Sequence, residues 1–290
     1  MNKLMMFAAL LAALGQEAGA DYISGRKAAA AFAQSGKHQE ALIAYSNLFA
    51  EAKSDFQKTD ALEQAAFWAG ILRQHDQAME FARRIPIAAA SKNCRMKILR
   101  DTGKNKELVA EFKDETITDW PESLVGDGSH YRGAAYYSLK DGKAAEADLK
   151  TAANYMTDDT KAAAVLLMLG DNYRNNLQDD AGALEAYNKV PEKLKGASYI
   201  TLTAIVAAAG IQRKQGKYEE ALKTLQKADV AKLTGTWLAT FLCAQGEISE
   251  AQGRKAEALA KYQAAAAVEG LPASQKDSYA KKAKALQEAP

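Results

Sequence analysis

Residues 253–262 read GRKAEALAKY, and related stretches read GKYEEAL at 216–222 and GKHQEALIAY at 36–45. Each stretch begins with glycine and places alanine five residues later, and the two longer copies end on tyrosine four residues after that alanine. Weaker copies follow the same template at 75–78, 103–108, 142–147 and 183–187. A pattern that recurs at a near-constant interval is typical of repeat architectures. The fold is therefore predicted from a repeat and not from a single motif.

The central small residue of each copy serves as its anchor. The anchors follow one another at intervals of 30 to 39 residues, and they are Ala41, Ala78, Leu108, Ala147, Ala183, Ala221 and Ala258. A second set of small residues precedes most anchors by twelve or thirteen positions: Ala29, Ala66, Ala135, Gly170, Ala209 and Gly246. Two crowded points in each repeat indicate two antiparallel helices whose backbones approach closely.

The composition favours helices throughout. Alanine dominates the 48% hydrophobic content, proline occurs only 5 times, and alanine is the best helix former. Glycine ends a helix at little cost, and the predicted stops after the first helices are Gly36, Gly103, Gly142, Gly216 and Gly253. Four residues after several anchors, on the same helix face, stand the bulky side chains Tyr45, Phe112, Tyr187 and Tyr262. Small and large side chains are expected to pack together.

These features resemble the tetratricopeptide repeat (TPR) family, whose pattern is W-x2-L-G-x2-Y, then A-x3-F, then P. The match is close at Leu169-Gly170-x-x-Tyr173 followed by Ala183-x3-Tyr187. It recurs at Gly246, at Ala258-x3-Tyr262 and at Pro272. Leu108 replaces an anchor alanine, and Ala82 and Thr151 stand where an aromatic residue is usual, so the third unit fits the pattern least well. The resemblance implies an all-α, right-handed α-solenoid of about seven helix hairpins over residues 21–272.

Three segments lie outside the regular repeat. We predict a loop from Trp120-Pro121 through 126–129, and a join between units at Pro191 and Gly196. Residues 273–290 are predicted to form a C-terminal helix that caps the last apolar face. A helix that docks on a membrane surface or a partner is the alternative for this segment.

The first twenty residues have the features of an export signal. Lys3 precedes the apolar run 4–14, and Ala18-Gly19-Ala20 has the small-x-small pattern of a cleavage site. We therefore predict cleavage after Ala20 and a periplasmic or secreted protein without an integral membrane segment; a buried amino-terminal helix is the alternative. Cys94 and Cys243 fall four repeats apart, too far for a disulfide, and are expected to be free and mostly buried.

The sequence offers little that could carry chemistry. Its 38 basic and 36 acidic residues are spread evenly, which disfavours nucleic acid as a partner. His38, His75 and His130 fall in separate units near predicted turns or helix starts, without ligands at metal-binding spacing. Ser129 beside His130 is interpreted as a helix cap, not as a nucleophile. We expect no catalytic residue, metal or cofactor.

The remaining candidate is the concave surface, which the first helix of every unit lines in the resembled family. Trp68 and Trp237 are expected to pack between units. The helical period counted from the anchors places these candidate residues on the concave surface: Arg26, Lys97, Arg100, Arg132, Tyr136, Asp171, Arg174, Arg213 and Lys214. Arginine pairs bidentately with carboxylates, so a peptide that bears acidic groups would suit this surface. The alternative is that these charges only keep the concavity soluble.

The sequence therefore predicts a non-enzymatic scaffold in the bacterial cell envelope that binds a protein or peptide in its groove. A self-associating assembly factor is one alternative. Two others are a hydrolase of envelope polymers that uses Ser129 and a sugar-binding surface that uses Trp120 and the neighbouring tyrosines.

Overall fold

The computed structural model describes residues 20–196 and 198–288. The predicted export signal, residues 1–20, lies outside the described residues except for Ala20, so its cleavage stays a prediction. Within the described ranges, no helix is long and apolar enough to cross a membrane.

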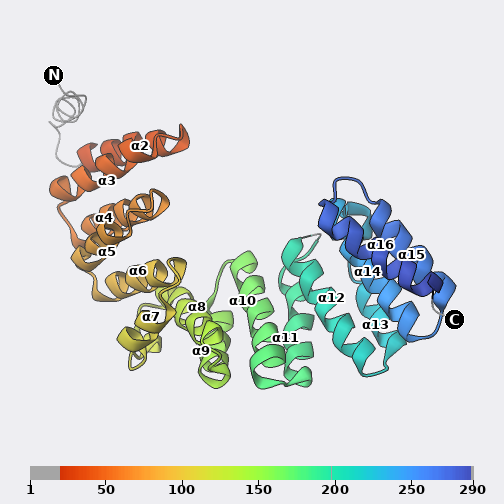
Figure 1. The fold of residues 1–290 in the computed structure, drawn as a ribbon. Helices are drawn as coiled ribbons and strands as arrows, with labels where there is room; N and C mark the ends of the chain where they lie inside the picture. The colour runs from red at the N-terminus through yellow and green to blue at the C-terminus, as the bar shows by residue number, and fades with distance from the viewer. Residues whose placement is uncertain (1–19, 197, 289–290) are drawn as a thin grey trace. The chain divides into compact units, whose positions relative to one another are not determined.

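The described residues form helices and no strands, which confirms the predicted all-α fold (Figure 1). The helices follow one another along the chain in seven pairs: α2 (Ala20–Gln34) and α3 (His38–Glu51), α4 (Asp55–Ile71) and α5 (His75–Arg84), α6 (Ala88–Asp101) and α7 (Asn105–Phe112), α8 (Glu122–Ser138) and α9 (Gly142–Tyr155), α10 (Asp159–Asn172) and α11 (Asp180–Lys193), α12 (Tyr199–Lys214) and α13 (Tyr218–Leu225), and α14 (Gly235–Ala251) and α15 (Lys255–Ala267). A π-helical turn, η2 (Tyr173–Leu177), extends α10, and short 3-10 turns, η1 (Ile117–Asp119) and η3 (Val230–Lys232), precede α8 and α14. The chain divides within α8, between Ala135 and Tyr136, into two compact units.

The C-terminal segment forms α16 (Ala273–Glu288), which packs against α15. Ala283 of α16 is buried, and Tyr279 and Leu286 lie against the same apolar cluster as Tyr262. The predicted C-terminal helix is therefore present and covers the last hairpin.

Six of the seven predicted anchors lie at the packed centre of their hairpins. They are fully buried, and they are Ala41, Ala78, Leu108, Ala183, Ala221 and Ala258. Gly170 lies so close to the ring of Tyr187 that a Cβ atom would stand 2.4 Å from it, and Gly246 is equally tight against Tyr262, at 2.7 Å. Small residues therefore receive the large aromatic side chains of the second helix, as predicted.

The fourth anchor was wrong. Ala147 is exposed, whereas Ala145 is fully buried and occupies the anchor position. The prediction took Gly142 as the residue that ends the first helix, and it counted five residues from there to the anchor. In the structure Lys140 takes the left-handed conformation of the turn (φ 64°), and Gly142 is the first residue of α9. A Cβ on Gly142 would stand 2.8 Å from Leu177, so this glycine permits close packing and does not stop a helix. Gly36, Gly103, Gly216 and Gly253 do adopt positive φ at the turns, as predicted.

The predicted loop over 126–129 is also wrong, because α8 already begins at Glu122. Gly128 faces the indole of Trp120, and a Cβ there would stand 2.6 Å from the ring. The glycine thus lets the helix pass close to the tryptophan. Ser129 and His130 lie within the helix, so Ser129 is not its cap and His130 is not near a helix end.

The join between the fifth and sixth hairpins is shorter than predicted. Pro191 lies in the last turn of α11, and the join contains Gly196 with a φ of 98°.

The two cysteines are free, as predicted. Cys94 is partly buried and Cys243 is buried. Burial raises the pKa of Cys94 to about 12 and that of Cys243 to about 11.

Candidate functional site

A cleft of about 370 Å³ opens in the C-terminal unit beside α12. The first helix α12 contacts both α10 and α14, and no residue of the second helices α11, α13 and α15 lines the cleft. Its lining comes from the π-helical turn after α10 and from α12 and α14: Arg174, Tyr199, Leu202, Thr203, Val206, Ala207, Gly210, Arg213, Lys214, Thr236, Trp237, Thr240 and Glu247. We call this surface the α12 cleft.

The α12 cleft has an apolar floor and an aromatic rim. Leu202 belongs to the core cluster beneath it, and the partly buried Val206 packs against that cluster. Tyr199 is 58% exposed and Trp237 is 38% exposed, with their ring centroids 6.2 Å apart. Trp237 thus contacts the preceding hairpin, as expected, but more than a third of its surface stays exposed. Its position in the first turn of α14 places it beside Tyr199 at the open rim.

Three of the predicted cations, Arg174, Arg213 and Lys214, line the α12 cleft. Arg213 approaches Glu247 at 3.5 Å, and Glu247 also pairs with Lys282 of α16. The one carboxylate in the lining thus has two cations beside it. Lys214 is exposed and makes no ion pair with the described part of the chain. The cleft therefore carries an excess of positive charge over an apolar floor.

The other two candidates of the C-terminal unit have packing roles. Asp171 accepts a hydrogen bond of 2.7 Å from the Tyr187 hydroxyl. Burial, followed by this carboxylate, raises the pKa of Tyr187. Tyr136 is partly buried against the cluster that contains Tyr187. These two residues support the hairpin and are not part of the cleft lining.

The candidates of the N-terminal unit are engaged within the protein. Arg26 pairs with Asp60 at 2.6 Å. Lys97 and Arg100 both pair with Asp101, and Arg100 also lies over the ring of Tyr131. A cleft of this unit beside Trp120 is not lined by any of these three side chains.

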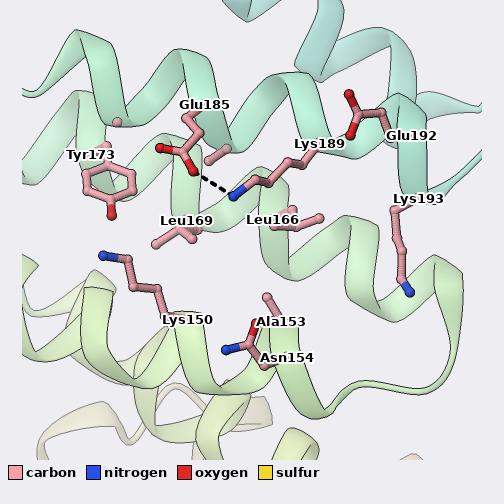
Figure 2. A pocket seen from close by; sticks show the side chains of 12 residues that line it. Lys150, Ala153, Asn154, Leu166, Leu169, Tyr173, Glu185, Lys189, Glu192 and Lys193 are labelled. Atoms are coloured by element: carbon pink, nitrogen blue, oxygen red, sulfur yellow. Dashed lines mark hydrogen bonds and ion pairs between the residues drawn. The ribbon is translucent and has the colours of Figure 1, made fainter.

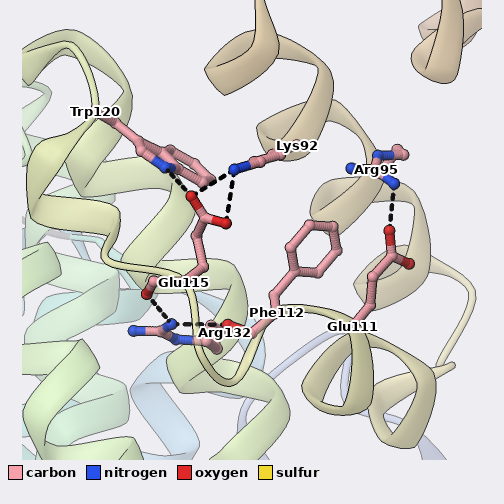
Figure 3. A network of polar contacts seen from close by, with 7 residues as sticks. All are labelled: Lys92, Arg95, Glu111, Phe112, Glu115, Trp120 and Arg132. Carbon is pink, nitrogen blue, oxygen red and sulfur yellow. Dashed lines mark hydrogen bonds and ion pairs between the residues drawn. The ribbon is translucent and has the colours of Figure 1, made fainter.

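Arg132 belongs to a network that fixes the connection between α7 and α8 (Figure 3). It donates to the backbone oxygens of Phe112, at 2.9 Å, and Glu115, at 2.7 Å. The Glu115 carboxylate accepts from Lys92 at 2.7 Å and from the Trp120 indole at 2.9 Å. Arg132 therefore holds the chain and is not directed at a ligand.

The residues named for two of the alternatives are not placed for those roles. Trp120 is buried and hydrogen-bonded, so its face is not available to stack on a sugar ring. Ser129 is buried and its oxygen has no hydrogen-bond partner among the described residues, so it lacks the base that a nucleophile needs. Within the described residues, no group of histidine, cysteine and carboxylate side chains could hold a metal.

No family model and no curated protein matches this sequence. Among solved structures, a tetratricopeptide repeat protein from Parabacteroides merdae is similar, with a TM-score of 0.49 and 14% identity over 93% of this chain and 100% of that chain. The TPR2AB domain of yeast Sti1, in a complex with pHSP90, has a TM-score of 0.36 and 15% identity over 79% and 98% of the two chains. A Rap protein complexed with competence and sporulation factor has a TM-score of 0.40 and 15% identity over 79% and 69%.

The hairpins themselves show contacts that the TPR pattern predicts. Glycine-to-tyrosine contacts at Gly170 and Gly246 stand where the TPR pattern requires them. The chain has a TPR-like fold. The α12 cleft lies on α12 and α14, the first helices of their hairpins, and on the turn that follows α10.

A second, larger concavity of about 640 Å³ lies between α9 and α11, over α10 (Figure 2). Three lysines line it, and each has a carboxylate partner: Lys150 with Glu146, Lys189 with Glu185, and Lys193 with Asp159. Glu192 also lines the concavity and makes no ion pair with the described part of the chain, so every cation in the lining is matched and one carboxylate is not. Unlike the α12 cleft, this concavity therefore has no unmatched lysine to offer an acidic ligand.

Sequence reasoning missed Tyr199. Counting back from Arg213 by seven residues reaches Val206, and a further seven reaches Tyr199. Residues seven apart lie on nearly the same face of a helix. The period that selected Arg213 would have selected the aromatic rim as well.

Proposed function

We propose that this protein is a non-enzymatic scaffold that binds a protein or peptide partner in the α12 cleft. The observation that carries the proposal is the combination of Tyr199 and Trp237 with Arg213 and Lys214 around one apolar floor. Aromatic and arginine side chains dominate the binding energy of many interfaces. The partner expected here presents an apolar or aromatic side chain together with a carboxylate.

The pairing of Arg213 with Glu247 is compatible with this role. A carboxylate of the partner would compete with Glu247 for Arg213, and Lys282 would still neutralise Glu247 after the exchange. Leaving Glu247 matched lowers the cost of binding, because an unmatched charge at an interface is expensive. Lys214 needs no such exchange.

We also infer that the protein acts in the cell envelope, on the basis of the export signal predicted for residues 1–20. Expression in a bacterium, fractionation and N-terminal sequencing test this inference. The expected product begins at Asp21 in the periplasm or medium. A cytoplasmic product that retains Met1 would contradict it.

Affinity capture from envelope extract tests the α12 cleft. The bait pair is the wild-type protein and the Arg213→Glu/Lys214→Glu variant. The matched control is Lys223→Glu/Lys281→Glu, which changes the net charge equally at two exposed positions outside the cleft. A partner recovered by wild type and control, and lost from the cleft variant, supports the proposal; equal recovery by all three baits contradicts it.

Self-association is the competing role, and light scattering during size-exclusion chromatography distinguishes it. A monomeric mass over a hundredfold range of concentration is expected. A dimer that the Arg213→Glu/Lys214→Glu variant abolishes would replace the partner with a second copy of the chain.

A further inference from the structure

The first helix of the second hairpin, in the N-terminal unit, exposes three large apolar side chains along one side. Positions 56, 60, 63, 67 and 71 of α4 lie on one side of the helix, because they follow steps of three and four residues. Phe56 is 77% exposed, and Phe67 and Ile71 are exposed as well. Phe67 and Ile71 lie one helical turn apart, and the carboxylates of Asp60 and Glu63 stand between them and Phe56. Exposed apolar side chains gathered on one side of a helix mark an interaction surface more often than scattered ones do.

The neighbouring helices extend this row. Arg26 of α2 donates to Asp60, which holds α2 beside α4, and the exposed Ile23 lies one turn before Arg26 on α2. On the other side, the ammonium of Lys97 from α6 lies 5.7 Å from the Phe67 ring centroid. We call the surface made by Ile23, Phe56, Glu63, Phe67 and Ile71 the α4 face.

One carboxylate of the α4 face lacks a cation. Asp60 accepts hydrogen bonds from Arg26 and from Tyr22, and Lys97 pairs with Asp101. Glu63 is partly buried between Phe56 and Phe67 along the helix, and no hydrogen bond or ion pair to a described residue engages it. Burial, and then the charge of Asp60, raise the pKa of Glu63. A cation brought by a partner would find this carboxylate unmatched.

We propose that the α4 face is a second docking surface, which takes an amphipathic helix with apolar residues on one side and a lysine or arginine near its middle. The row from residue 56 to residue 71 is about 22 Å long, the length of about four helical turns. Helices that dock by an apolar side present anchors at intervals of three, four and seven residues. The proposed cation would lie opposite Glu63, between the anchors that contact Phe56 and Phe67.

Two other occupants fit the α4 face less well. An anionic membrane surface would be repelled by the Glu63 carboxylate and would offer it no cation. The lysine-rich helix α16 of a second copy has its apolar residues Tyr279 and Leu286 packed in its own C-terminal cluster. This docking surface does not rest on the proposed function of the α12 cleft, and the experiment below separates the two.

Selection from a displayed library of random 16-residue peptides tests the α4 face directly. The wild-type protein is the target, and the folded Phe56→Ser/Phe67→Ser variant removes peptides that bind elsewhere. Enriched peptides are expected to carry apolar residues at helical spacing and one central lysine or arginine. For such a peptide, Glu63→Lys should weaken binding at least tenfold, and its lysine-to-glutamate twin should regain binding to Glu63→Lys.

Two controls separate binding at the α4 face from binding at the α12 cleft and from loss of folding. Arg213→Glu in the α12 cleft should leave the affinity of the selected peptide unchanged, and circular dichroism should be the same for all variants. Selection without enrichment over the Phe56→Ser/Phe67→Ser variant would overturn the proposal. So would equal affinity of the lysine and glutamate twins for the wild-type protein, or a dimer in sedimentation that Phe56→Ser dissociates.

Discussion

The α4 face and the α12 cleft occupy corresponding places on TPR-like hairpins, yet their chemistry is opposite. The α4 face exposes Phe56 and Phe67 around the unmatched carboxylate of Glu63. The α12 cleft has Trp237 at its rim and the exposed cation of Lys214. Beneath both, alanine and glycine positions hold the same kind of hairpin. Positions that a second helix covers are thus fixed by packing, and the uncovered positions are free to select different partners.

The close packing of small and aromatic residues within the hairpins is expected to be the main source of their stability. Tyr262 is fully buried against Gly246, so Tyr262→Ala should lower the free energy of unfolding of the C-terminal unit by about 3 to 5 kcal/mol, measured by urea denaturation. Tyr262→Phe loses only the 2.5 Å hydrogen bond to Glu250 and should cost roughly 1 kcal/mol. If both variants lost the same stability, the close packing of small and large residues would not be what holds the hairpin.

The second prediction concerns the α12 cleft alone. Trp237→Ala should weaken binding of the captured partner about thirtyfold, corresponding to about 2 kcal/mol for an aromatic residue that the partner covers. Because Trp237 is only partly buried, its unfolding free energy should change by less than about 1 kcal/mol. Calorimetric titration and urea denaturation measure the two effects. An unchanged affinity would remove Trp237 from the binding surface.

The third prediction concerns the ion pair that distinguishes the N-terminal unit. Burial acts to raise the pKa of Asp60, but hydrogen bonds from Arg26 and Tyr22 outweigh it and lower the pKa below its ordinary value. A carboxyl with a lowered folded-state pKa stabilises the protein above its unfolded-state pKa, and this stability is lost as pH falls through the folded-state value.

Asp60→Asn should therefore cost roughly 1 kcal/mol at pH 7, and the difference from wild type should shrink below pH 4. Thermal denaturation between pH 2.5 and pH 7 measures it. A cost that is independent of pH would mean that shape, not charge, explains the effect of Asp60.

The smallest expected effect is a gain in folding stability when Glu63 is replaced by glutamine. Its pKa is raised, so the charged form is disfavoured in the folded protein, and stability falls as pH rises from the unfolded-state pKa through the folded-state value. Glu63→Gln should stabilise the protein by a few tenths of a kcal/mol at pH 7 and have no such effect at pH 3. A destabilised variant at pH 7 would show that Glu63 has an internal partner, and the α4 face would lose its reason to seek a cation.

The sequence predicted the hairpins because crowding at their centres leaves room only for small side chains. It failed where one residue type serves two purposes. Gly142 and Gly128 allow a helix to pass close to Leu177 and to Trp120, whereas Gly36 and Gly253 end helices in the left-handed conformation. Because both roles use the same residue type, the predicted fourth anchor was two residues away from the buried one, and the helical segment 126–129 was interpreted as a loop.

The candidate site was predicted only in part for a related reason. The helical period places a cation on a face, but it does not show which acidic side chain of a neighbouring repeat will neutralise it. Arg26 meets Asp60 from the next hairpin, whereas Lys214 meets no acid within the described residues. Contacts between repeats therefore decide which arginines and lysines remain available to a partner. The periodicity of a single helix does not reveal those contacts.

The most direct test of the proposed difference between the two faces is site-specific photocrosslinking in envelope extract. A benzophenone amino acid replaces Thr203 in the α12 cleft, Phe56 on the α4 face, or Lys189 at the concavity between α9 and α11. The account predicts crosslinked products at the first two positions, different from each other, and none at Lys189. Identical products at Thr203 and Phe56, or products only at Lys189, would contradict it.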